Sequence, residues 1–108
     1  MTIVDDVLKD MREMANLPPD KTGLPAIVWV DDDLANLFHG PRIKVFRSGE
    51  NFSVSISDNP QVEAGKCFLD SQDLKKVCSW IIKNKEALLD FGYQRISQPK
   101  LMDILQKV

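Results

Sequence analysis

The sequence has few of the residues from which catalytic and metal sites are usually built. Its 108 residues include two cysteines and one histidine, and its five glycines are scattered along the chain. Without help from other ligands, Cys67, Cys78 and His39 cannot complete the four-ligand shell of a structural zinc ion. No glycine-rich loop of the kind that cradles phosphate groups is present. We therefore expect two reduced thiols, no bound metal and no cofactor.

Long apolar runs and a strong net charge are also missing. The apolar stretch 24–30 is far shorter than the roughly 20 residues of a membrane span. Asp5 and Asp6 stand where a signal peptide would carry positive charge, so we expect no membrane partner and a cytoplasmic location. The formal net charge of −2 disfavours nucleic-acid binding by the chain as a whole, but it leaves room for a local basic patch. Length and composition predict one domain, residues 1–108.

The stretch 70–91 predicts a long amphipathic helix around which the other segments pack. No Gly or Pro interrupts it, and at ~100° per residue its polar side chains fall on one narrow arc. The apolar remainder spans about 200°, far more than an ordinary surface helix needs. We expect Asp70 or Ser71 to cap the start of this helix and Gly92 to follow its end. One flank is left for the terminal helix or a partner to cover, and it consists of Trp80, Asn84, Ala87 and Phe91.

Shorter patterns predict the remaining elements. Residues 2–17 have apolar side chains at helical spacing and end at a proline pair, which indicates an N-terminal helix. Residues 24–30 form a branched and aromatic run typical of a central strand. Residues 42–47 and 52–57 alternate on either side of a turn and predict a hairpin, in which Phe52, Val54 and Ile56 face the core.

Two further elements complete the predicted fold. A fourth strand is expected near residues 66–69, and a short helix within residues 97–108 begins at Ser97 or Gln98. The predicted class is therefore α+β: an N-terminal helix, an antiparallel sheet of three or four strands, a long amphipathic helix on one face and a short C-terminal helix.

Acidic residues after the strand at 24–30 form the first candidate site. Asp31, Asp32 and Asp33 precede His39, and oxygen ligands at a strand end can hold a hard cation such as Mg²⁺. Because consecutive strand residues alternate sides, three in a row cannot all face one ion unless the backbone turns. We therefore favour a solvated strand end and keep a metal-dependent hydrolase as an alternative.

The outer face of the predicted hairpin is the second candidate site. Arg42, Lys44 and Arg47 are placed there beside Phe46 and the serines of the second strand. A basic ribbon with an aromatic ring and hydroxyl groups can grip phosphates. A solvated sheet face has the same composition, and an acidic protein would fit it as well as a nucleic acid.

Lys85 falls within the apolar arc of the long helix. Burial of its ammonium group would be costly and would suggest a function. We expect its aliphatic stem to lie along the apolar surface and its charge to reach water.

The order of motifs between residues 24 and 91 resembles a group of small bacterial and phage domains of unknown function. In those domains a His-x-Pro-His-type segment opens a strand, and a helix with a Trp-Ile-x-x-Asn-like signature closes the domain. This chain has His39-Gly40-Pro41 in the first place, with Arg42 where the second histidine is common, and Trp80-Ile81 with Asn84 in the second. The resemblance implies no particular activity, although some of those domains lie beside toxin–antitoxin-type genes.

The absence of a catalytic set favours a non-catalytic protein-interaction module, or a homodimer, over an enzyme. Trp29, Trp80 and Phe46 are the aromatic residues expected at its surface, because aromatic side chains concentrate at interface hot spots. Nucleic-acid binding through residues 42–57 is the alternative. The expected interaction residues are Arg42, Lys44, Phe46, Arg47, Trp80, Asn84 and Phe91.

Overall fold

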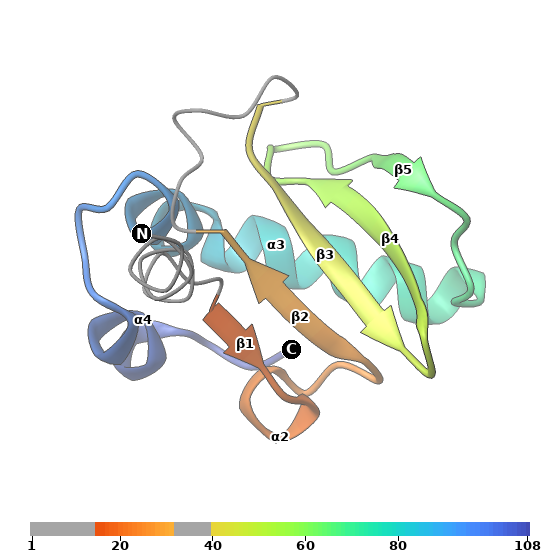
Figure 1. Ribbon diagram of the computed structural model, residues 1–108, viewed down its shortest axis with the longest axis horizontal. Coiled ribbons are helices and arrows are strands. Elements are labelled where there is room, and N and C mark those ends of the chain that lie inside the picture. Colours follow the sequence, from red (N-terminus) through yellow and green to blue (C-terminus); the bar gives the residue numbers. More distant parts are fainter. Residues whose placement is uncertain (1–14, 32–39) are drawn as a thin grey trace, which may run out of the picture.

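The computed structural model describes residues 15–31 and 40–108. Five strands form one antiparallel sheet in which neighbours in sequence are neighbours in space (Figure 1). The strands are β1 (Ala15–Leu17), β2 (Ile27–Val30), β3 (Arg42–Arg47), β4 (Glu50–Ser55) and β5 (Val62–Gly65). The described helices are α2 (Pro19–Thr22), α3 (Ser71–Gly92) and α4 (Gln98–Ile104). The predicted α+β class is confirmed, with five strands in place of three or four.

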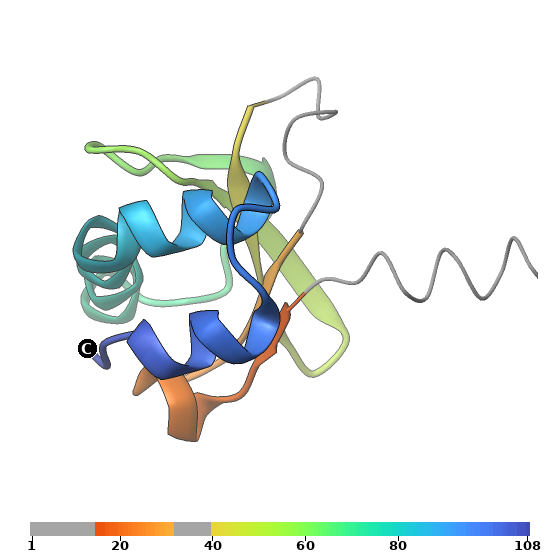
Figure 2. The same ribbon diagram turned by 90° about the vertical axis from the view of Figure 1, so that its left-hand side faces the viewer.

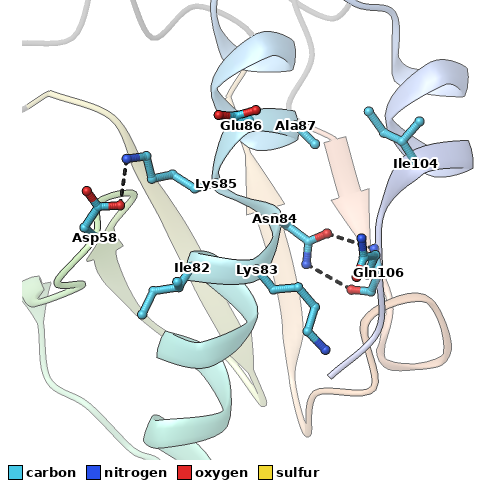
Figure 3. Close-up of a pocket in the computed structure, with 9 residues that line it drawn as sticks. All are labelled: Asp58, Ile82, Lys83, Asn84, Lys85, Glu86, Ala87, Ile104 and Gln106. Carbon is cyan, nitrogen blue, oxygen red and sulfur yellow. Dashed lines mark hydrogen bonds and ion pairs between the residues drawn. The ribbon is translucent and has the colours of Figure 1, made fainter.

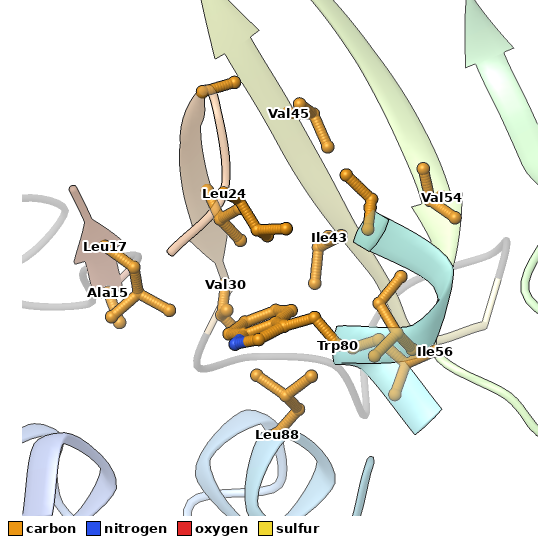
Figure 4. Packing of buried hydrophobic residues seen from close by; sticks show 14 of the residues in the cluster. Ala15, Leu17, Leu24, Val30, Ile43, Val45, Val54, Ile56, Trp80 and Leu88 are labelled. Carbon is orange, nitrogen blue, oxygen red and sulfur yellow. The ribbon is translucent and has the colours of Figure 1, made fainter. Parts of the chain in front are cut away.

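Helices α3 and α4 lie on the same side of the sheet (Figure 2). The strand residues that point toward them form the core, and Phe52, Val54 and Ile56 belong to it as predicted. Trp80 of α3 is part of the same cluster (Figure 4) and has no exposed surface. The cluster also includes Ala15, Leu17, Leu24, Ala26, Val28, Val30, Ile43, Val45, Leu69, Val77, Ile81, Leu88, Phe91 and Leu101.

Strand β1 corrects the predicted helix over residues 2–17. Residues 2–14 lie outside the described part of the chain, but Ala15–Leu17 is a strand and not the end of a helix. It pairs with β2 so that Ala15 lies opposite Val30 and Leu17 opposite Val28. Both apolar side chains of β1 are buried while Asn16 is exposed, because strand neighbours point to opposite faces.

The hairpin of β3 and β4 has a tighter turn than the sequence predicted. Arg47 lies opposite Glu50, so the loop contains two residues, Ser48 and Gly49. Both have positive φ angles, 52° and 82°, as a type I′ turn requires. Strand β5 was expected near residues 66–69 and is found at Val62–Gly65, on the far edge of the sheet.

The long helix begins as predicted and ends differently. The Asp70 carboxylate accepts a hydrogen bond from the backbone N–H of Asp73 at 2.8 Å, which caps the first turn. Gly92 was expected to follow the helix but is its last residue, and Tyr93 is the C-cap. Ser97 caps α4 by accepting a hydrogen bond from the backbone N–H of Lys100 at 3.3 Å.

Candidate interaction surface

The second face of the sheet is not covered by any described helix (Figure 2). Side chains that alternate with the core residues point to this side, and the strand register brings them together. Trp29 lies between Asn16 and Lys44, and Phe46 lies between Ile27 and Asn51. We call this surface the open face; its described members are Asn16, Ile27, Trp29, Arg42, Lys44, Phe46, Asn51, Ser53 and Ser55, of which Ser53 is only 3% exposed.

Two aromatic rings form the centre of the open face. Trp29 of β2 and Phe46 of β3 stack with their ring centroids 4.9 Å apart and their planes 16° from parallel. Both side chains are half-buried. Such a pair adds about 0.5–1.5 kcal/mol beyond the area that it buries. The stack therefore fixes an apolar platform in position before any partner arrives.

Two cations lie beside this platform. Lys44 is exposed and sits directly opposite Trp29, and Arg42 is half-buried further along β3. Neither forms an ion pair with another described residue. The alternation of β3 thus follows the prediction, in which these two residues share the face of Phe46.

Arg47 does not belong to the open face. It shares the parity of Ile43 and Val45 and therefore points toward the helix side of the sheet. Its guanidinium carbon lies 4.9 Å from the centre of the Phe68 ring, a cation–π contact. The predicted grouping of Arg47 with Arg42 and Lys44 is wrong because residue 47 is an odd number of positions from both.

Trp80, Asn84 and Phe91 also lie away from any free surface. Their exposed fractions are 0%, 3% and 4%. Helix α4 packs against α3, and its Leu101 is fully buried. The segment after α4 is hydrogen-bonded to Asn84 of α3. Most of the wide apolar arc of α3 is therefore covered within this chain, although Ile82 is 50% exposed. The buried residues of the arc do not by themselves indicate an interface with a partner.

A pocket of about 350 Å³ lies where α3 meets the segment after α4 (Figure 3). Asn84 and Gln106 form one side of it, and Lys85 and Asp58 form another. The Lys85 ammonium reaches the Asp58 carboxylate at 2.8 Å, and the side chain of Lys85 is 30% exposed. This confirms that the lysine stem lies along the helix surface while its charge leaves the core.

The two cysteines are free thiols, both half-buried. The Cys67 thiol donates to the backbone carbonyl of Leu69 at 3.6 Å, and the Cys78 thiol donates to that of Pro60 at 3.8 Å. Burial raises the pKa of Cys78 above its ordinary value of 9.0, and the neighbouring Cys67 raises it further. Cys78 is therefore a poor nucleophile near neutral pH.

The acidic candidate site falls largely outside the described residues. Asp31 is described and half-buried, whereas Asp32, Asp33 and His39 are not described. Within residues 15–31 and 40–108, no three His, Cys, Asp or Glu side chains come together as metal ligands would. The metal-dependent alternative stays a prediction. No helix in the described part of the chain is both long and apolar enough to cross a membrane.

The structure adds two relationships that the sequence did not reveal. The stacking of Trp29 on Phe46 depends on the register between β2 and β3, and the burial of Asn84 depends on a backbone partner at Gln106. For the stacking, the sequence offered a continuous apolar run at residues 24–30 and an alternating pattern at residues 42–47, neither of which specifies the register. For the partner of Asn84, the sequence offered no signal. In comparisons with protein families, curated proteins and solved structures, nothing matches this chain, so the resemblance to the phage and bacterial domains also stays a prediction.

Proposed function

We propose that this chain is a non-catalytic interaction module that binds an acidic segment of a partner protein on the open face of its sheet. The observation that carries the proposal is the stacked pair Trp29–Phe46 with Lys44 beside it. An apolar centre with polar residues around it has the anatomy of a protein interface. Trp and Arg, which dominate interface hot spots, are both present on this face.

Charge decides which partner fits. Arg42 and Lys44 have no ion pair with another described residue, although the chain as a whole carries a net charge of −2. Acidic side chains of a partner would complement these two cations and favour the correct orientation on approach. A second copy of this chain fits less well, because two open faces packed together bring like charges close to one another.

A single-stranded nucleic acid is the competing occupant, since such strands stack on aromatic rings beside cations. Two features favour a protein instead. Trp29 and Phe46 stack on each other, so one face of each ring is already covered. Arg47, the third basic residue of the hairpin, points to the other side of the sheet. Among residues 15–31 and 40–108, the open face therefore offers two cations, few for a phosphate backbone.

Selection of peptides on the full chain tests the proposal. Random 12-residue peptides are selected on the immobilised protein and then measured against two charge reversals, Lys44→Glu on the open face and Lys75→Glu on the exposed surface of α3. We expect acidic peptides with apolar residues, whose affinity falls at least tenfold for Lys44→Glu and stays unchanged for Lys75→Glu. Peptides without acidic bias, or equal affinity for both variants, would contradict the proposal.

A labelled 15-nucleotide oligo(dT) strand serves as the second probe in the same experiment. We expect no binding at 150 mM salt. Tight binding that weakens steeply with salt and is lost in Lys44→Glu, but not in Lys75→Glu, would show that the open face binds a nucleic acid and not an acidic protein segment.

A further inference from the structure

The last residues of the chain lie extended against α3 without belonging to the sheet. Helix α4 ends at Ile104, and Leu105 has φ −62° and ψ 136°, which is extended backbone. Residues 105–108 then follow the flank of α3 that carries Asn84 (Figure 3). An extended segment outside a sheet needs other partners for its backbone groups.

Asn84 supplies two of those partners. Its amide nitrogen donates to the backbone carbonyl of Gln106 at 2.9 Å, and its carbonyl oxygen accepts from the backbone N–H of Gln106 at 2.8 Å. This paired exchange is what a neighbouring strand offers to a residue in an antiparallel ladder. The Asn84 side chain therefore acts as a one-residue substitute for a strand.

Two further contacts also involve the main chain of the extended segment. The Lys83 ammonium donates to the carbonyl of Lys107 at 2.9 Å, and the N–H of Val108 donates to the carbonyl of Thr22 at 2.9 Å. The side chains of residues 106–108 are exposed, whereas Leu105 is half-buried and packs against the core. The site thus recognises a backbone conformation and one apolar anchor, with little dependence on the other side chains.

The residue chosen at position 84 is unusual for a purely structural contact. Asn has a poor helix propensity, and burial of an amide is costly unless its hydrogen bonds are made. Asn84 is 3% exposed in the middle of a 22-residue helix. An apolar residue would cover the flank of α3 at lower cost if packing alone were needed, so recognition of an extended backbone explains the choice better.

We propose that Asn84, Lys83 and Thr22 form a binding site for an extended peptide, which residues 105–108 occupy within the same chain. An extended segment of a partner protein would bind there by displacing residues 105–108. Other proteins recognise peptides in a similar way, by main-chain hydrogen bonds to an added strand. The neighbouring pocket of about 350 Å³ is lined by Ile82, Ala87 and Ile104 together with Gln106, so release of residues 105–108 would open it further. This site is separate from the open face and does not depend on the function proposed for it.

The variant Gln106→Pro in the full chain tests this site. Proline removes the N–H that Asn84 accepts from, and the extended backbone of Leu105 is compatible with a following proline. The matched control is Gln106→Ala, which keeps the N–H. The probe is a fluorescein-labelled peptide with the sequence of residues 102–108, MDILQKV. We expect Gln106→Pro to bind it at least tenfold more tightly than the wild type or Gln106→Ala.

A second peptide, MDILPKV, has proline at the position of Gln106 and should bind at least tenfold more weakly than MDILQKV. Equal binding of the two peptides, or no binding of MDILQKV to Gln106→Pro, would overturn the proposal. Circular dichroism of Gln106→Pro gives an independent check, because global unfolding would show that residues 105–108 belong to the core and cannot be displaced. A wild-type dimer by light scattering that becomes a monomer in Gln106→Pro would assign the site to a second copy instead of a partner protein.

Discussion

Asn84 and Gln106, 22 positions apart in the sequence, are joined by two hydrogen bonds that run in opposite directions between one side chain and one backbone. This pair fastens the end of the chain to the middle of α3. Trp80 and Phe91, which belong to the same flank of α3, are buried within this chain, and α4 packs against the helix.

Replacement of Asn84 should reveal how much this pair contributes to stability. Asn84→Ala leaves the N–H and the carbonyl of Gln106 without their protein partner, so we expect the free energy of unfolding to fall by about 2–3 kcal/mol. Urea denaturation monitored by circular dichroism measures this loss. The surface variant Asp58→Asn, which removes a largely exposed ion pair with Lys85, should change the stability by less than about 1 kcal/mol.

Asn84→Asp should make the stability depend on pH. An ionised carboxylate cannot donate to the carbonyl oxygens of Trp80 and Gln106 and is repelled by them. The pKa of the new carboxyl is therefore raised on folding, and the stability is present at low pH and lost as pH rises through that folded pKa. We expect the variant to approach the wild type near pH 4.5 and to fall below it at pH 7.5. Equal stability of the two proteins at pH 7.5 would contradict the hydrogen-bond directions given above.

Gly65 and Gly49 have similar backbone angles but different surroundings. Their φ values are 81° and 82°, so alanine at either position is strained by about 1–2 kcal/mol. A Cβ at Gly65 would lie 2.7 Å from the backbone oxygen of Asn51, whereas Gly49 has nothing within 4 Å. We expect Gly65→Ala to destabilise the protein by at least about 1 kcal/mol more than Gly49→Ala, because overpacking adds to the strain. Equal thermal stability of the two variants would show that β5 does not approach β4 this closely.

The turn between β3 and β4 offers a stabilising substitution. Ser48 has φ 52° in a two-residue type I′ turn, where asparagine followed by glycine is strongly preferred. Ser48→Asn should raise the free energy of unfolding by about 0.5–1 kcal/mol. Ser48→Val should lower it, because a branched side chain resists positive φ. Denaturation of both variants in urea compares them, and a reversed order would mean a different turn.

Cys78 should become reactive only at high pH. Because burial, and then Cys67, raise the pKa of its thiol above 9.0, the folded protein keeps the thiol neutral where the unfolded chain ionises it. This contribution to stability is complete below about pH 9 and is lost as pH rises through the folded pKa. Alkylation by iodoacetamide, followed by peptide mass spectrometry, should show a higher midpoint pH for Cys78 in the folded protein than in urea. Identical midpoints would argue against its burial.

The predictions from sequence held best where a pattern was long. The 22 residues of α3 repeat the helical period six times over. Each hairpin strand has several apolar side chains at a spacing of two residues. Strand β1 has only three residues. So short a stretch does not show whether its apolar residues recur every two positions, as in a strand, or continue the helical spacing of the preceding sequence. Its conformation is decided by pairing with Val28 and Val30, which are contacts distant in sequence.

The candidate sites were harder to predict, for a related reason. Lys44 and Phe46 could be placed on one face because they belong to a single strand, but their meeting with Trp29 depends on the register between two strands. Asn84 was assigned to an interface because it lies on a flank of the long helix for which the sequence indicated no single covering element. Its partner in the structure is the backbone of Gln106. A backbone group is present at every position, so no side-chain pattern could have identified that partner.

The indole N–H signals of the two tryptophans offer the most direct test of the open face as the binding surface. Trp29 is half-buried on the open face, whereas Trp80 is fully buried on the helix side of the sheet. Both indole nitrogens are buried, so the Trp29 signal reports changes around its ring when a peptide binds to that face. A nitrogen–proton correlation spectrum of the ¹⁵N-labelled protein, assigned with Trp29→Phe, is recorded while a peptide selected on the full chain is added to saturation. We expect the Trp29 signal to shift with the binding curve and the Trp80 signal to stay in place. A saturating peptide that moves the Trp80 signal and leaves the Trp29 signal unchanged would contradict this expectation.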